Sequence, residues 1–206
     1  MEITRPKSKQ PIPDNAKKVF GGVLFDVYQW EQELFDGTKT TFEKLKRPDT
    51  VVVLPVLPDG RIILIEEEQP GAAIYIGPLG GRVDEGEDAL EAARRELLEE
   101  SGYEAREMNL WYARQITTKI DWAVYVFIAK GIQKVAEPAL EAGEKIKLFP
   151  ITLEEFMNGA TKISDDSGDS KKVAIKFGED EITIQFLKAK LDQKKKKELE
   201  ELFNPL

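Results

Sequence analysis

Short apolar runs with strand character fill the first third of the chain. Alternating apolar and polar positions extend over residues 18–47, and Asp36-Gly37 stands between two such runs where a type I′ hairpin turn is expected. Residues 50–69 hold two runs rich in β-branched side chains around Pro58-Asp59-Gly60, which predicts a second hairpin with one strand buried on both faces. The pattern therefore predicts an N-terminal antiparallel β element followed by the first strands of a larger domain.

A helical period begins only after a segment rich in glycine and proline. Residues 76–87 read IGPLGGRVDEGE and predict a loop. Residues 88–101 are strong helix formers, and they end at Gly102, which suits the left-handed position just past a helix. A loop, a helix and a glycine stop are expected in that order.

The chain returns to strands beyond this helix. Apolar runs predict strands at residues 122–129 and 146–151. Thr152 is followed three places later by Glu155, the spacing of a capping box that opens a short helix. Two strands and a short helix are therefore expected after the glycine stop.

The C-terminal part is strongly charged. Residues 164–172 predict a flexible surface loop, and residues 172–186 fit either a hairpin around Gly178 or the start of the final helix. From about Ile184 the pattern is helical. The lysine run at residues 194–197 is followed by glutamates, which favours a solvated, salt-bridged helix face over a nucleic-acid or lipid site.

Composition narrows the possible chemistry. The 206 residues are 41% hydrophobic, enough for one main domain with an appended element. With 38 acidic and 30 basic residues the net charge is -8, so neither nucleic acid nor an anionic membrane is expected as a partner. The chain has no Cys and no His, which excludes disulfides, thiolate nucleophiles, the usual zinc sites and His-dependent triads. The groups that remain available for catalysis are carboxylates, other oxygen groups, Lys, Arg and a bound metal.

The first residues predict neither a signal peptide nor a membrane anchor. Residues 1–17 are polar and carry three prolines, so a flexible lead-in of a cytoplasmic protein is expected. No later apolar run approaches the ~18 residues that a membrane span needs. The expected organisation is the lead-in, an N-terminal β element at residues 18–47 with a possible role in dimerisation, and a main domain with a C-terminal helix at residues 48–206.

Three glutamates share one patch of the predicted helix. At about 100° per residue, Glu96 and Glu100 lie about 40° apart along the edge of an apolar stripe, and Glu99 lies beside them. Carboxylates drawn towards a core have raised pKa values unless a positive charge neutralises them. An oxygen-only ligand set suits Mg²⁺ or Mn²⁺. A site for a divalent cation is predicted here.

Arg95 lies on the same predicted helix, but its side chain is expected to point in a different direction from the glutamates. It lies about 40° from both Glu91 and Glu99, so it is expected to point away from the glutamate cluster and to clamp the helix to the loop at Glu87. The competing interpretation is an ordinary solvated face, since 33% of the chain is charged.

The spacing of charged and glycine positions decides between these interpretations. Over residues 81–103 the sequence resembles the Nudix box, the signature of the Nudix hydrolase family, at every charged and glycine position. The matching positions are Gly81, Glu87, Arg95, Glu96, Glu99, Glu100 and Gly102.

The resemblance implies a fold and a reaction. The fold is α/β: a Nudix-like α/β/α sandwich with a mixed sheet, here preceded by the N-terminal antiparallel β element, and the box forms a loop, a helix and a loop. The reaction is Mg²⁺-dependent hydrolysis of a pyrophosphate bond in a nucleoside diphosphate derivative by a metal-activated water, with Mn²⁺ as a possible substitute.

The resemblance also implies roles for single residues. Glu96 and Glu100 would be the principal metal ligands, Glu99 an accessory ligand, and the carbonyl of Gly80 a further one. Glu99, Glu100 and a base outside the box would carry catalysis. Gly81, Glu87, Arg95 and Gly102 would be structural.

One branch of the family matches further features of the chain. Its length, the N-terminal β element and residues 47–56 before the box resemble ADP-ribose pyrophosphatases, which implies ADP-ribose or another nucleotide sugar as substrate and a homodimer. In that branch the base is a Glu on a loop before a late strand; Glu144 has the matching position, Glu141 is a second candidate, and an ordinary loop acid is the alternative. Partner strands help to form the pocket, so Trp30, Tyr28 and Phe35 could stack on a base, although aromatic residues at strand spacing are more often core.

The chain also departs from that branch. Thr117-Thr118-Lys119 stands where a proline is typical, residues 66–78 hold no counterpart of the usual arginine before the box, and Tyr103 replaces a smaller aliphatic residue. ADP-ribose is therefore one candidate among nucleotide sugars and related diphosphates. A non-catalytic Nudix module that binds a nucleotide, and a purely structural acidic domain, are the alternative hypotheses.

Overall fold

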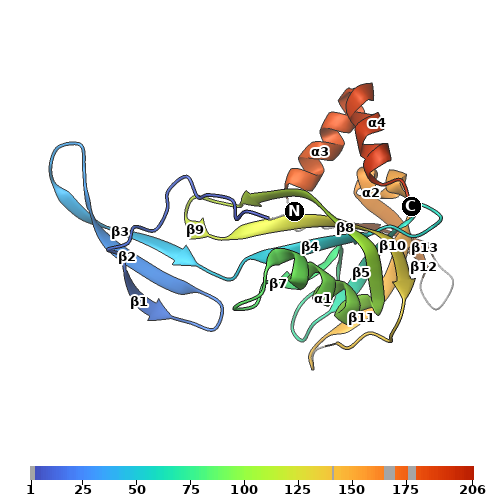
Figure 1. The fold of residues 1–206 in the computed structure, drawn as a ribbon, viewed down its shortest axis with the longest axis horizontal. Coiled ribbons are helices and arrows are strands. Elements are labelled where there is room, and N and C mark those ends of the chain that lie inside the picture. Colours follow the sequence, from blue (N-terminus) through green and yellow to red (C-terminus); the bar gives the residue numbers. More distant parts are fainter. Residues whose placement is uncertain (1–2, 141, 165–169, 176–179) are drawn as a thin grey trace.

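An extended β-sheet at the N-terminal end joins a body of strands and helices (Figure 1). The computed structural model describes residues 3–140, 142–164, 170–175 and 180–206. The strands are β1 (Lys17–Gly21), β2 (Asp26–Glu33), β3 (Lys39–Lys46), β4 (Thr50–Pro55), β5 (Ile62–Glu68), β6 (Tyr75–Gly77), β7 (Leu79–Arg82), β8 (Tyr103–Gln115), β9 (Ile120–Asp121), β10 (Ala123–Lys134), β11 (Lys145–Ile151), β12 (Ala160–Ser164) and β13 (Ser170–Ala174). The helices are α1 (Ala89–Ser101), α2 (Leu153–Asn158), α3 (Asp180–Leu191) and α4 (Gln193–Leu202).

The body is built on two sheets. One has the order β7-β4-β10-β8, with β4 parallel to β10 and the other pairs antiparallel, and the second has the order β11-β5-β6. Because β4 has a neighbour on each edge and side chains packed on each face, its apolar run is continuous, as expected for a strand buried on both faces.

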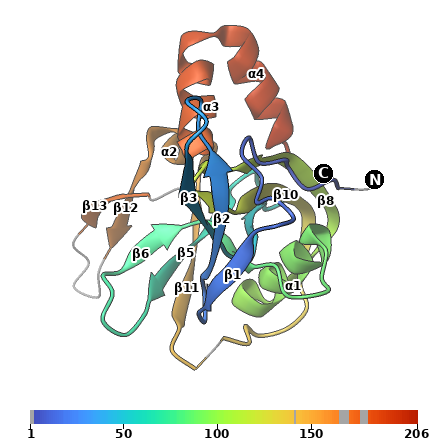
Figure 2. The same cartoon turned by 90° about the vertical axis from the view of Figure 1, so that its left-hand side faces the viewer.

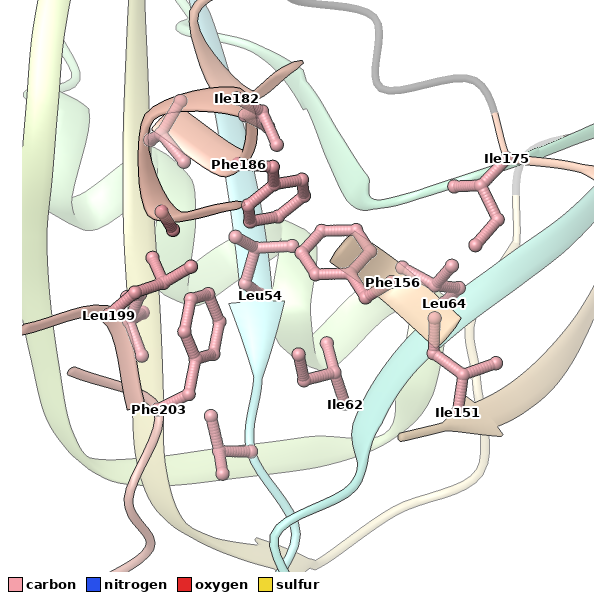
Figure 3. Packing of buried hydrophobic residues seen from close by; sticks show 14 of the residues in the cluster. Leu54, Ile62, Leu64, Ile151, Phe156, Ile175, Ile182, Phe186, Leu199 and Phe203 are labelled. Atoms are coloured by element: carbon pink, nitrogen blue, oxygen red, sulfur yellow. The ribbon is translucent and has the colours of Figure 1, made fainter. Parts of the chain in front are cut away.

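Alternate residues of these strands supply two separate hydrophobic cores. Val51 and Val53 of β4 pack with Leu97 of α1 on one face, whereas Leu54 packs with Phe156 and other residues of α2, α3 and α4 on the opposite face. Figure 3 shows the second core, and Figure 2 shows α1 and the α3–α4 pair on opposite sides of the strands. The predicted α/β/α sandwich with a mixed sheet is confirmed.

The N-terminal element is an antiparallel sheet with one addition. β1, β2 and β3 pair antiparallel, and the short β9 then runs parallel to β3, which connects this sheet to the body. The hairpin at Asp36-Gly37 is confirmed, but its predicted type I′ turn is wrong. Leu34 O accepts from Gly37 N at 3.0 Å, and Gly37 has a φ of 81° while no described non-glycine residue has a positive φ. The turn is therefore a type I turn closed by a left-handed glycine.

The second predicted hairpin is only a chain reversal. Leu57 N donates to Arg61 O at 2.8 Å, but beyond this turn β4 and β5 share a single bridge between Val56 and Ile62. The two strands then separate into different sheets because both edges of β4 are taken by β7 and β10.

Three further expectations need correction. Part of the predicted loop at residues 76–87 is strand, since it contains β7 and most of β6. The predicted single C-terminal helix is two helices, because the Asp192 backbone leaves the helical region at φ -136° and its side chain caps α4. The long strand β8 was not predicted, because its many charged and exposed residues hide the strand period.

The remaining C-terminal expectations are partly testable. Residues 180–186 are helical, and residues 165–169 and Gly178 lie outside the described residues, as does the proposed turn there. The lysine run of α4 forms i to i+3 and i to i+4 ion pairs with the glutamates that follow it, which confirms a salt-bridged face.

The lead-in, expected to be flexible, makes specific contacts from residue 3 onward. Arg5 forms a two-pronged ion pair with Asp49 at 2.7 and 2.9 Å and a second pair with Asp121 at 3.1 Å. The Nζ of Lys44, a buried lysine of β3, donates to Ser8 Oγ at 2.8 Å. These polar side chains tie the segment to both the N-terminal sheet and the body. In the described part of the chain no helix is long and apolar enough to span a membrane.

Leu64 provides a test of the core. It lies on β5, is fully buried, and packs in the core beneath α2–α4, so Leu64→Ala should lower the free energy of unfolding by about 2 to 5 kcal/mol. The matched control is Leu191→Ala at the end of α3, where the side chain is 89% exposed and the change should stay within about 0.5 kcal/mol. Urea unfolding followed by circular dichroism measures both, and equal effects would contradict the described packing.

Candidate functional site

Helix α1 has well-defined ends that fix its register. The Asp88 side chain accepts from the backbone N–H groups of Leu90 and Glu91, and Glu91 returns a bond to the Asp88 N–H, which completes a capping box. At the other end Gly102 adopts a φ of 72°, and a Cβ there would lie 2.0 Å from Ala136 O. Only glycine fits this position without strain. The glutamates of the last two turns are therefore held in one orientation.

Two glycines of β7 bring backbone against this helix. A Cβ on Gly81 would lie 2.2 Å from Glu96 Oε1, and a Cβ on Gly80 would lie 2.1 Å from Val51 O. Gly80 N donates to Glu100 Oε2 at 2.9 Å. The absence of side chains thus allows β7 to lie directly between the helix carboxylates and β4.

The three glutamates differ in exposure. Glu100 is only 8% exposed, Glu96 is half-buried, and the Glu99 side chain is 44% exposed. Burial is the largest cause that raises the pKa of Glu100, to about 8, opposed by the Gly80 N–H and supported by the charges of Glu96, Glu67 and Glu144. Burial also raises the pKa of Glu96, against the lowering effect of Arg95. These carboxylates have a strong electrostatic demand for a cation.

Arg95 does not point away from the cluster as predicted from the helical angle. Its guanidinium contacts Glu96 Oε1 at 2.8 Å and Glu99 Oε2 at 3.0 Å, because the long side chain bends back along the helix surface. It also binds both carboxylate oxygens of Glu87 at 3.0 Å and the Arg82 carbonyl at 2.8 Å. The hydrogen bonds from Arg95 hold the pKa of Glu87 below its ordinary value. Arg95 thus joins the loop before the helix to the glutamate patch.

A cavity of about 380 Å³ opens in front of these carboxylates. Glu144, on the loop before β11, also lines it, so the structure brings this predicted residue into one cavity with the box glutamates. Glu141, the second candidate, lies outside the described residues. The described lining residues are Glu67, Gln69, Gly80, Gly81, Arg82, Asp84, Arg95, Glu96, Glu99, Glu100, Ala139, Leu140 and Glu144.

Glu67, Gln69 and Arg82 line the cavity but were not singled out from the sequence. Glu67 could have been found from strand alternation, because Ile63 and Ile65 of β5 pack in the core on the α1 side and Glu67 continues this series. Gln69 donates a short hydrogen bond to Glu67. No sequence pattern marked Arg82.

The donor set fits a hard divalent cation. The buried Glu100 and the half-buried Glu96 offer carboxylate oxygens beside the backbone of Gly80, and Mg²⁺ and Mn²⁺ prefer such oxygen ligands. Within the described residues, no three acidic side chains already converge as a metal cage. One oxygen of Glu96 and one of Glu99 are instead bound by Arg95.

The aromatic residues of the N-terminal sheet do not line this cavity in the same chain. Trp30 is 7% exposed, packs on Phe42 with ring centroids 6.0 Å apart, and is therefore a core residue of its sheet. Tyr28 lines a different cavity, between the lead-in and β2. Phe35 lies fully exposed at the hairpin turn. The expected stacking of Trp30 on a base is inconsistent with its burial.

Comparison with known proteins agrees with this geometry. A model of the NUDIX domain family matches residues 46–174. The ADP-ribose pyrophosphatase of Bacillus subtilis (strain 168) is 30% identical over 144 residues, 68% of this chain and 78% of the relative. The methanol dehydrogenase activator of Bacillus methanolicus is 28% identical over 146 residues, 69% of this chain and 78% of the relative. The ADP compounds hydrolase NudE of Escherichia coli (strain K12) is 32% identical over 104 residues, 49% of this chain and 55% of the relative.

A solved structure shares the fold. The crystal structure of an ADP compounds hydrolase superposes with a TM-score of 0.60 and 24% identity, covering 74% of this chain and 83% of that chain.

The raised pKa of Glu100 predicts that the metal-free protein is destabilised by its own carboxylate. Between its ordinary pKa of 4.5 and the folded value of about 8, the folded state keeps the proton that the unfolded state releases, so stability falls as pH rises through this window. Glu100→Gln removes the ionisation and keeps an acceptor for Gly80 N. At pH 7 this substitution should raise the free energy of unfolding by on the order of 2 kcal/mol, which corresponds to an increase in Tm of about 4 to 8 °C.

Thermal unfolding in EDTA between pH 5 and pH 9 measures this effect. The gain should be small at pH 5 and largest above pH 8. Glu104→Gln, an exposed acid on β8, serves as control and should leave Tm unchanged. A gain that does not vary with pH would show that packing, and not ionisation, separates the variant from the parent.

Proposed function

Because this chain belongs to the Nudix family and is a Nudix hydrolase, we propose that it uses Mg²⁺ to cleave the pyrophosphate bond of ADP-ribose or another nucleotide sugar. The observation that carries the proposal is the common cavity of the box glutamates and Glu144.

The proposed metal ligands are the carbonyl of Gly80 and the carboxylates of Glu96, Glu99 and Glu100, with Mn²⁺ as a substitute for Mg²⁺. The burial of Glu100 and the close approach of Gly81 to Glu96 support this set, because both place oxygen donors where water is scarce. A bound divalent cation would lower the pKa of a coordinated water and stabilise charge on the diphosphate oxygens.

The protein's own residues would perform the remaining steps. Glu144 is proposed as the general base, whose carboxylate accepts a proton from the water that attacks one phosphorus while the other phosphate leaves in line. Its position in the same cavity as the box glutamates supports this role. The Gly80 N–H orients Glu100, and Arg95 keeps the Glu87 loop on the helix.

The proposed substrate class follows from the relatives and the cavity. Two relatives are an ADP-ribose pyrophosphatase and an ADP compounds hydrolase, and ADP-ribose and other ADP compounds contain a nucleoside diphosphate. The cavity of about 380 Å³ lies in the lower part of the range of small-molecule sites. A diphosphate with part of one sugar would fill it.

A homodimer built through the N-terminal sheet is also proposed. This sheet projects from the body in Figure 1, and its described residues expose large apolar side chains such as Val19, Phe20 and Val23. Exposed apolar groups gathered on a projecting sheet are typical of a surface that a second copy covers.

The hydrolase proposal predicts turnover that depends on a divalent cation. Incubation with Mg²⁺ and ADP-ribose, other nucleotide sugars, dinucleoside polyphosphates and nucleoside triphosphates should release nucleoside monophosphate from at least the first two classes. EDTA should abolish the reaction, and Mg²⁺ or Mn²⁺ should restore it. Phosphorus NMR identifies the products.

Two variants separate the proposed roles. Glu100→Gln should lower kcat by at least about 100-fold, and Glu144→Gln should lower it by about 100- to 10,000-fold while divalent-cation affinity is retained. Glu104→Gln is the control. Unchanged turnover in Glu100→Gln would refute its role, and silence across the panel together with tight, metal-independent nucleotide binding would favour the non-catalytic module instead.

The dimer proposal predicts a particle of twice the 23.3 kDa chain mass in sedimentation equilibrium. Replacing Phe20 and Val23 by Glu should produce monomers, because charges would be buried at the proposed interface. Leu187→Glu, at an exposed apolar position of α3, should leave the mass unchanged. A single 23.3 kDa species of the parent protein at micromolar concentration would exclude this dimer.

A further inference from the structure

The walls of the box cavity carry far more negative than positive charge. Among its described lining residues are six carboxylates, on Glu67, Asp84, Glu96, Glu99, Glu100 and Glu144, and two guanidiniums, on Arg82 and Arg95. A diphosphate entering this cavity needs positive groups or N–H donors for the oxygens that do not contact a cation. Only the two arginines of this lining could supply charged N–H donors.

All N–H donors of the Arg95 side chain are already used in hydrogen bonds. Its five N–H groups can each donate one bond, and the structure gives five hydrogen bonds from this side chain. Every one of them goes to a carboxylate of the box or to the Arg82 carbonyl. A phosphate oxygen could be bound by Arg95 only after one of these bonds is broken.

Arg82 is placed differently. Its side chain is exposed, lines the cavity, and makes no ion pair or hydrogen bond to any described residue. The peptide unit that follows it is held at both of its polar groups: the Arg82 carbonyl accepts from Arg95 at 2.8 Å, and the Val83 N–H donates to Asp49 O at 2.9 Å. A guanidinium with five open donors therefore extends from a rigid point at the cavity rim.

A second arginine near this point has no ion pair with any residue that the structure describes. Arg47 joins β3 to β4, and its guanidinium lies over the Trp122 ring at 4.4 Å from the centroid. Its Nε is buried and has no hydrogen-bond partner among the described residues. Burial, and then the charge of Arg82, lower the pKa of Arg47, so the two guanidiniums are close enough to repel each other. An anion near Arg82 would relieve that repulsion.

We infer that Arg82 is a substrate-binding residue that donates to a phosphate oxygen of the diphosphate at the rim of the box cavity. The inference rests on the proposed function for the identity of the substrate, but the anion-binding position itself does not depend on turnover. Arg82 thereby supplies the charged N–H donors that Arg95 cannot supply. It lies next to the junction with the N-terminal sheet, where it pairs with Thr50 of β4. The other end of the substrate would extend towards that sheet.

Arg82→Ala should raise KM for the best substrate of the panel at least about tenfold while kcat changes less than about threefold, because a charge-assisted hydrogen bond is lost in both ground and transition states. Arg82→Lys should recover most of the affinity lost in the Ala variant. Arg106→Ala on β8 removes an equally exposed arginine away from the cavity and should have no effect.

A direct binding measurement makes the test independent of catalysis. Titration calorimetry with inorganic pyrophosphate and Mg²⁺ should show an affinity at least about tenfold weaker for Arg82→Ala than for the parent and for Arg106→Ala. If the parent protein cleaves nothing in the panel, the proposed function fails, and this titration still decides the role of Arg82. Equal pyrophosphate affinity in the parent and Arg82→Ala, or an equal loss in Arg106→Ala, would overturn the inference.

Discussion

The close approach of β7 to α1 is the constraint on which the site depends. Gly80 and Gly81 have no side chains, so backbone lies where any Cβ would collide with Val51 or with the Glu96 carboxylate. This contact gives Glu100 its hydrogen bond from the Gly80 N–H and removes the carboxylate from water at the same time. Charge that is buried in this way raises the carboxyl pKa and makes a cation the natural partner. The same packing therefore fixes the geometry of the site and creates its electrostatic demand for a positive charge.

Those features of the site that depend on neighbouring residues could be predicted from the amino-acid sequence. The capped helix, its glycine stop and the spacing of the glutamates depend on residues less than 25 positions apart, and the structure contains the helix as expected. The position of Glu144 required the resemblance to a family, since nothing in its neighbourhood marks it. Arg95 was misplaced because a helical angle gives the direction of Cβ, whereas a long side chain reaches neighbours along the helix surface.

The parts that were missed depend on pairing between distant segments. β8 is recognisable as a strand only through its long antiparallel ladder with β10, because exposed charged residues interrupt its apolar period. The turn at residues 57–61 suggests a hairpin. However, β7 and β10 pair with the two edges of β4, so β5 shares only a single bridge with the end of that run. Likewise, the lead-in has a composition that predicts disorder, but contacts with distant residues hold it, among them the bidentate ion pair between Arg5 and Asp49 and the hydrogen bond from Lys44 to Ser8. The composition of a segment does not indicate which distant segments it will pair with.

The junction between the two parts of the molecule has a role beyond connection. Asp49 receives the side chain of Arg5, the Val83 N–H and the Ala123 N–H, so one residue links the lead-in, the end of β7 and the start of β10. Arg82 is the last residue of β7 and is adjacent to this network. The backbone that follows Arg82 is therefore held by the same residue that anchors the lead-in. The guanidinium makes no bond to a described residue, so the anion-binding position that we infer for it depends on this backbone anchor.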